Sequence, residues 1–135
     1  MKKIIPVLAL TLLLFGTIAL ASVTDYTETL PTFGHKELAK NQKTTTQQYA
    51  YHTSNTFGIL YKCWLDSQLT NGSSSWTLVS DDFYGGGLPQ IPPANTVTVH
   101  YELVPSVGKN VRLRSQKPEG EVFGGQTVSG TMDFR

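Results

Sequence analysis

Aromatic side chains are the residues of this chain best suited to contact a ligand. On the surface of a β-sheet such rings stack on sugar rings, and polar neighbours such as Gln47, Gln48 and Asp66 can hydrogen-bond hydroxyl groups. The competing interpretation is that most rings fill the core, which period-two spacing predicts for Tyr61 and for one of the two tryptophans. The aromatic residues concerned are Tyr49, Tyr51, Trp64, Trp76, Phe83 and Tyr84. The candidate ligand-binding residues are Trp64, Trp76 and Tyr84.

Metal chemistry has little support in the sequence. His35, His52 and His100 are far apart and lack the spacing of zinc ligands, so they are expected at the surface or rim of the fold. Asp81 and Asp82 precede a glycine-rich stretch and could offer oxygens to calcium, but a solvated turn fits them better because the alternating acidic pattern of a dedicated site is missing. We therefore expect neither metal nor cofactor.

Catalytic signatures are also missing. The chain has no Gly-x-Ser-x-Gly motif, and its single cysteine, Cys63, lies on the apolar face of a predicted strand, where a thiol is inert. A bulge could instead expose Cys63 and let it join two chains. A pair of carboxylates for glycoside cleavage can meet in space from any two positions, but nothing in the sequence nominates a pair. The sequence predicts a non-enzymatic protein.

The first residues have the features of an export signal. Lys2 and Lys3 precede an apolar stretch over residues 4–20, which ends in the small residues Ala19 and Ala21. Cleavage after Ala21 is expected. A retained membrane helix is the alternative, but no basic stop-transfer cluster follows. Ser22 stands where a lipoprotein would have cysteine, so we expect a secreted protein without a membrane anchor.

Removing residues 1–21 from the chain of 135 leaves 114, enough for one domain, residues 22–135, that packs a core without disulfides. Without Lys2 and Lys3, nine basic residues stand against ten acidic ones, so the formal charge changes from +1 to −1. Such a balanced surface argues against nucleic acid and anionic lipid as partners. The sequence leaves the oligomeric state open.

Strand periodicity dominates the rest of the chain. Residues 22–30 show little apolar periodicity and are expected to form a mobile start. Ile59, Tyr61, Cys63 and Leu65 alternate on one face of a strand, and Asn71-Gly72 predicts a hairpin to a strand over residues 76–80. Further strands are predicted over residues 32–41, 48–53, 96–103, 111–114 and 127–134, and a loop over residues 85–93.

Two of these predictions concern side-chain placement. In the strand over residues 96–103, Val97, Val99, Tyr101 and Leu103 are expected to face the core. Arg112 and Arg114 share the outward face of a short strand, where charges commonly protect a sheet edge from unwanted pairing. Six or seven short strands without a long helix predict an antiparallel β-sandwich, with an open β-barrel as the alternative.

Short segments spread over most of the chain resemble a family of small exported Gram-positive bacterial proteins of unknown function. The segments are Phe33, residues 39–42, 48–55 and 127–130. This resemblance implies export, small size and a β-rich fold, and it carries no catalytic residues. A more distant likeness to lactococcin-type secreted β-sandwich bacteriocins rests on size and architecture alone.

These features lead to two expectations of function. The first is a secreted, non-enzymatic β-sandwich that binds a cell-surface glycan or protein through exposed aromatic residues. The alternative is a secreted, bacteriocin-like protein that acts against competing bacteria. A hydrolase with an unrecognised carboxylate pair is the least favoured reading.

Overall fold

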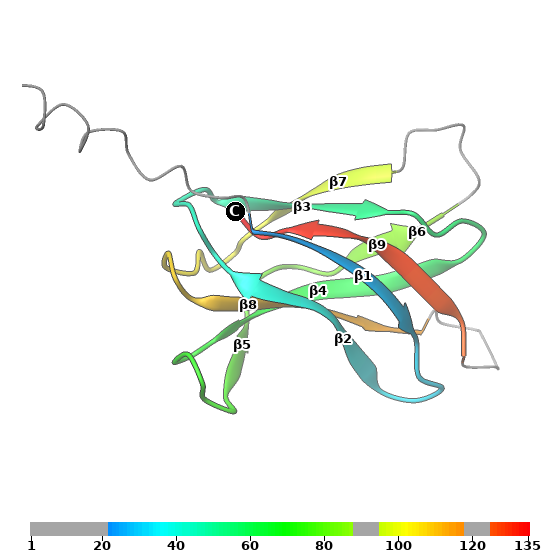
Figure 1. Ribbon diagram of the computed structural model, residues 1–135, viewed down its shortest axis with the longest axis horizontal. Coiled ribbons are helices and arrows are strands. Elements are labelled where there is room, and N and C mark those ends of the chain that lie inside the picture. Colours follow the sequence, from blue (N-terminus) through cyan, green and yellow to red (C-terminus); the bar gives the residue numbers. More distant parts are fainter. Residues whose placement is uncertain (1–21, 88–94, 118–124) are drawn as a thin grey trace, which may run out of the picture.

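The computed structural model describes residues 22–87, 95–117 and 125–135, which form nine antiparallel strands in two facing sheets (Figure 1). Sheet A has the order β1 (Val23–Thr29), β9 (Thr127–Asp133), β3 (Tyr49–Ser54), β7 (Asn95–His100). Sheet B has the order β2 (His35–Gln42), β8 (Asn110–Gln116), β4 (Leu60–Gln68), β5 (Trp76–Leu78), and β6 (Phe83–Gly86) also pairs with β4. The predicted β-sandwich is confirmed, with more strands than the six or seven expected.

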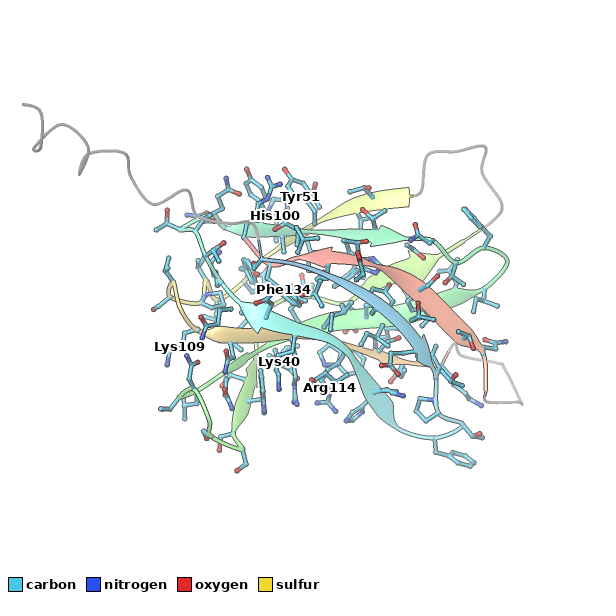
Figure 2. All side chains as sticks on the ribbon, viewed as in Figure 1. Lys40, Tyr51, His100, Lys109, Arg114 and Phe134 are labelled. Carbon is cyan, nitrogen blue, oxygen red and sulfur yellow. The ribbon has the colours of Figure 1, made fainter. Side chains whose placement is uncertain are left out.

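Alternating side chains fill the space between the sheets. Tyr61, Cys63 and Leu65 of β4 are fully buried, as the period-two spacing predicts. In Figure 2, Phe134 lies between the sheets, whereas Arg114 projects from the outer side of sheet B and Tyr51 from the outer side of sheet A. The burial of apolar surface between the two inner faces is the main force that holds such a sandwich together.

A buried group of polar side chains links the two sheets. The Tyr61 hydroxyl on sheet B lies 2.9 Å from the Tyr26 hydroxyl and 2.9 Å from Ser54 Oγ, both on sheet A. The Tyr26 hydroxyl also lies 2.6 Å from His52 Nε2. His52 is completely buried, so the prediction of a surface or rim position is wrong for this histidine. A buried polar group needs hydrogen-bond partners, and the Tyr61 contacts supply them between the sheets, whereas Nδ1 of His52 has no partner among the described residues.

Residues 22–30 differ from the mobile start that was predicted. Residues 23–29 form β1, which pairs with β9 over its whole length, from Val23 opposite Asp133 to Thr29 opposite Thr127. Tyr26 and Leu30 are buried, although the segment between them is polar. Because backbone pairing and two inward side chains hold β1 in place, a segment can be an ordered strand without apolar periodicity.

Three further predictions, on a hairpin, a loop and one side chain, can be compared with the structure. The hairpin at Asn71-Gly72 is confirmed, since β4 pairs with β5 across it and Gly72 has a φ of 87°. The loop predicted over residues 85–93 is wrong at its start, because Gly85 lies in β6 opposite Tyr61, against whose ring a side chain would collide. Residues 88–93 of that loop lie outside the described residues. Leu103 is 59% exposed and does not face the core, since β7 ends at His100.

The burial of His52 predicts a pH-dependent stability. Burial lowers the pKa of this imidazole from 6.5 to about 4, so it is neutral in the folded protein. Below pH 6.5 the unfolded chain takes up a proton that the folded protein does not, so stability falls until the pH reaches about 4. We expect the free energy of unfolding to drop by about 2 kcal/mol between pH 7 and about pH 4.5 on this account.

Urea unfolding at both pH values measures this drop. His52→Gln is the matched variant, because it removes the titrating group and leaves every carboxylate in place. The expected result is a smaller drop in the variant than in the parent protein. An equal drop in both proteins would contradict the assignment of this pH dependence to His52.

Cys63 is completely buried, and burial raises the pKa of its thiol to about 12. The thiolate is the reactive form of cysteine. We therefore expect iodoacetamide at pH 8 to modify the urea-unfolded protein at least about a hundredfold faster than the folded protein. Mass spectrometry of timed samples measures this ratio. Equal rates, or a disulfide-linked dimer on non-reducing gels, would instead support an exposed Cys63.

Candidate functional site

The outer face of sheet B brings the three candidate residues onto one surface. Trp64 lies on β4 between the inward-facing Cys63 and Leu65, so its side chain faces outward. Trp76 on β5 is opposite Gln68, and Tyr84 on β6 is opposite Lys62, which places both on the same face as Trp64. Lys62 and Gln68 are six residues apart on β4, so the aromatic residues span about 20 Å of the sheet.

Exposure differs among these three side chains. Tyr84 is 56% exposed, whereas Trp64 and Trp76 are both half-buried. The prediction that one tryptophan fills the core is therefore wrong, because both lie on the outer face. Exposure of a whole tryptophan ring to water is unfavourable in free energy. Partial burial on the sheet surface leaves part of each ring available for contact.

An ion-pair cluster lies between the two tryptophans. Asp66, only 7% exposed at its side chain, accepts from Arg112 Nη2 at 3.0 Å and from Arg114 Nη1 at 3.3 Å, both through Oδ2. Arg112 Nη1 also lies 3.6 Å from Glu37 Oε2 on β2. One carboxylate thus restrains two guanidinium groups. Partial burial lowers the pKa of Arg114, which stays charged at neutral pH.

Each arginine of this cluster packs against one tryptophan ring. The Arg112 guanidinium carbon lies 4.0 Å from the Trp76 ring centroid, and that of Arg114 lies 5.6 Å from the Trp64 ring centroid. Both distances are within the range of cation–π attraction. We call the five residues Trp64, Asp66, Trp76, Arg112 and Arg114 the tryptophan–arginine platform.

The platform corrects the interpretation of Arg112 and Arg114 as protection of a sheet edge. Their strand, β8, lies between β2 and β4 and is not an edge. Both arginines belong to the site, although the sequence predicts them only as charges on one outward face. The missing information was the register that sets Arg112 opposite Asp66 and Arg114 opposite Trp64.

A hollow of about 250 Å³ adjoins the platform. It is lined by His35, Lys62, Trp64, Leu78, Asp82 and Gln116. His35 meets the Trp64 ring edge-on at a centroid distance of 5.6 Å, and Lys62 Nζ lies 2.6 Å from Asp82 Oδ2. The hollow therefore has one aromatic wall together with hydrogen-bonding groups of both charges.

The remaining aromatic candidates lie elsewhere. Tyr49 and Tyr51 form an edge-on pair, 5.3 Å between centroids, on the outer face of sheet A, and Arg135 packs over Tyr51 at 4.8 Å. Figure 2 shows Tyr51 near His100 on that side. Phe83 points inward and lies 5.3 Å from the His52 ring. The aromatic residues thus divide between two opposite faces and the core.

Within the described part of the chain, no three His, Cys, Asp or Glu side chains gather in a way that could hold a metal ion. Asp81 and Asp82 are both exposed. His35 and His100 are exposed as predicted, on opposite sheets. The described residues also contain no helix of the length and apolarity needed to span a membrane.

Comparison with known proteins provides no relative from which a function could be transferred. No protein-family model matches the chain, and neither the curated proteins nor the solved structures contain a significant match. The fold and the chemistry of its surface are therefore the basis for any functional assignment.

The platform predicts unequal effects for two acidic residues on the same face. Asp66→Asn leaves two partly buried guanidinium groups without their shared counter-ion, so we expect a loss of about 2 kcal/mol in the free energy of unfolding. Asp82→Asn removes an exposed partner of Lys62 and should cost less than about 1 kcal/mol. Urea unfolding of both variants measures the difference. Equal losses would show that Asp66 is not the anchor of the platform.

Proposed function

We propose that the protein is a secreted, non-enzymatic β-sandwich that binds a cell-surface glycan through the outer face of sheet B. The observation that carries this proposal is the platform itself, in which Trp64 and Trp76 lie half-buried on one sheet face with their arginines held beside them. Aromatic rings contact the apolar faces of sugars, and guanidinium groups donate hydrogen bonds to sugar oxygens.

Preorganisation supports a binding role for this face. Asp66 contacts both Arg112 and Arg114, so these long side chains lose less rotamer freedom when a ligand binds than unrestrained arginines would. The platform and its hollow extend over about 20 Å of the sheet surface, which suits a linear polymer lying along β4. Charges of both signs are present, so the proposed ligand is an uncharged or weakly charged glycan.

Secretion is part of the same proposal. Its support is the signal-like sequence of residues 1–21 together with the start of β1 at Val23, just after the expected cleavage point. The backbone carbonyl of Ser22 accepts a hydrogen bond from the Phe134 amide at 3.3 Å. Cleavage after Ala21 would thus leave every described strand intact.

Co-sedimentation of the purified protein with whole bacterial cells and with isolated cell-wall polysaccharide tests the proposal. We expect saturable retention on the polysaccharide, and Trp64→Ala and Trp76→Ala should each weaken it about tenfold, which corresponds to about 1.4 kcal/mol of lost contact. Tyr84→Ala should have a smaller effect, because Tyr84 lies at one end of the face.

Tyr51→Ala, on the opposite face of the sandwich, is the matched control and should bind like the parent protein. Circular dichroism confirms that each variant is folded before its binding is compared. Retention that survives all three sheet B substitutions in folded protein would refute the proposed site. A protein that stays in the supernatant with both cells and polysaccharide would refute wall binding altogether.

A further inference from the structure

The edges of the two sheets are protected to different degrees. An exposed strand edge attracts other chains, and proteins normally block it with charges, bulges or short strands. β1 carries Asp25 and Glu28, and β2 carries charged residues and a bulge between Glu37 and Ala39. β5 and β6 have only three and four residues. β7 is six residues long and has no lysine, arginine, aspartate or glutamate (sequence Asn-Thr-Val-Thr-Val-His).

The backbone of β7 has hydrogen-bonding groups on its outer edge. The Tyr101 amide donates to the Gln48 carbonyl at 3.0 Å, which sets the phase of the pairing between this segment and β3. Because the bonds alternate in an antiparallel pair, Val97 and Val99 bond to β3, while the N–H and C=O groups of Thr96 and Thr98 point away from it. Among the described strands, β7 pairs with β3 alone, and Figure 1 shows it at the margin of sheet A.

A groove lies beside this edge. A single bridge, Ser80 to Tyr101, connects the segment after β5 to the end of β7. Beyond the bridge there is a cavity of about 350 Å³, with residues 98–100 on one side and residues 81–83 on the other. None of the described residues therefore fills the space next to Thr98, which is wide enough to be entered by an extended segment.

The charge of the groove indicates what would enter it. Asp81, Asp82 and Glu102 line it, and none of the described lysine or arginine residues does. Asp82 pairs with Lys62, whereas no ion pair with a described residue forms at Asp81 or Glu102. A second copy of this chain, paired through β7, would bring the acidic groups of both copies together, which is unfavourable. A basic segment would be attracted.

We propose that β7 is a docking edge, to which an extended, basic segment of a partner protein adds as a further strand of sheet A. Main-chain hydrogen bonds to Thr96 and Thr98 provide affinity, and lysine or arginine side chains near Asp81 and Glu102 provide selectivity. β7 belongs to a different sheet from the tryptophan–arginine platform, although Asp82 lines both the groove and the hollow beside the platform.

Fluorescence anisotropy with three end-blocked peptides tests the proposal. The first alternates lysine and valine over seven residues, the second replaces lysine with glutamate, and the third is the first with alternate backbone amides methylated. We expect the purified protein to bind the first peptide at least about tenfold more tightly than it binds either of the other two. Amide NMR shifts should concentrate at Thr96, Thr98 and their neighbours.

Two sets of variants locate the interaction. Thr98→Pro removes an outward N–H without removing a bond to β3, so it should abolish peptide binding in folded protein. Asp81→Asn combined with Glu102→Gln should weaken binding of the lysine peptide several-fold and leave the fold intact. Thr27→Pro, on the edge strand β1 at the other margin of sheet A, is the control and should bind the lysine peptide normally. If Thr27→Pro does not fold, Thr27→Lys replaces it as the control.

Three results would overturn the proposal. The first is the absence of lysine-peptide binding at near-millimolar protein, and the second is equal binding of the lysine and glutamate peptides. The third is a concentration-dependent dimer in analytical ultracentrifugation that Thr98→Pro disrupts, because it would assign the edge to a second copy of this chain.

Discussion

The contacts of the Tyr61 hydroxyl govern which residues this protein presents to solvent. Tyr61 belongs to sheet B, and its hydroxyl meets Tyr26 and Ser54 of sheet A inside the core. Because side chains alternate along a strand, an inward Tyr61 requires an outward Trp64 and Asp66. A slip of one residue in β4 would turn the Asp66 carboxylate toward the core and expose Tyr61. The buried polar group thus determines the composition of the outer face.

The parts of the fold that could be predicted are those with one apolar face. Tyr61, Cys63 and Leu65 in β4, and Val128 and Met132 in β9, recur at period two because one side of each strand faces the core. The Asn71-Gly72 turn is also predictable from the sequence, since glycine tolerates the positive φ of a tight reversal. Trp64 and Trp76 were recognised as candidates by residue type alone.

Other features depend on which strands become neighbours, and a single sequence does not contain this information. The sequence predicts Arg112 and Arg114 as charges of an edge strand, whereas β8 pairs with both β2 and β4. Lys43 is buried although it lies outside any strand, because its Nζ donates to the backbone carbonyls of Gln47 and Arg135 and lies 4.6 Å from the Tyr101 ring centroid. Contacts between distant segments can satisfy a charged group whose local sequence predicts exposure.

The strand order of sheet A has a consequence for the sequence of events during synthesis. β9 lies between β1 and β3, so the first strand of the described chain has no partner until residues 127–133 have been made. Strands so far apart in the sequence pair slowly, because the chain between them loses entropy in bringing them together before their contacts form. An incomplete chain therefore lacks the centre of one sheet and stays short of its native structure. That delay agrees with the proposed secretion, which requires an unfolded chain during transport across a membrane.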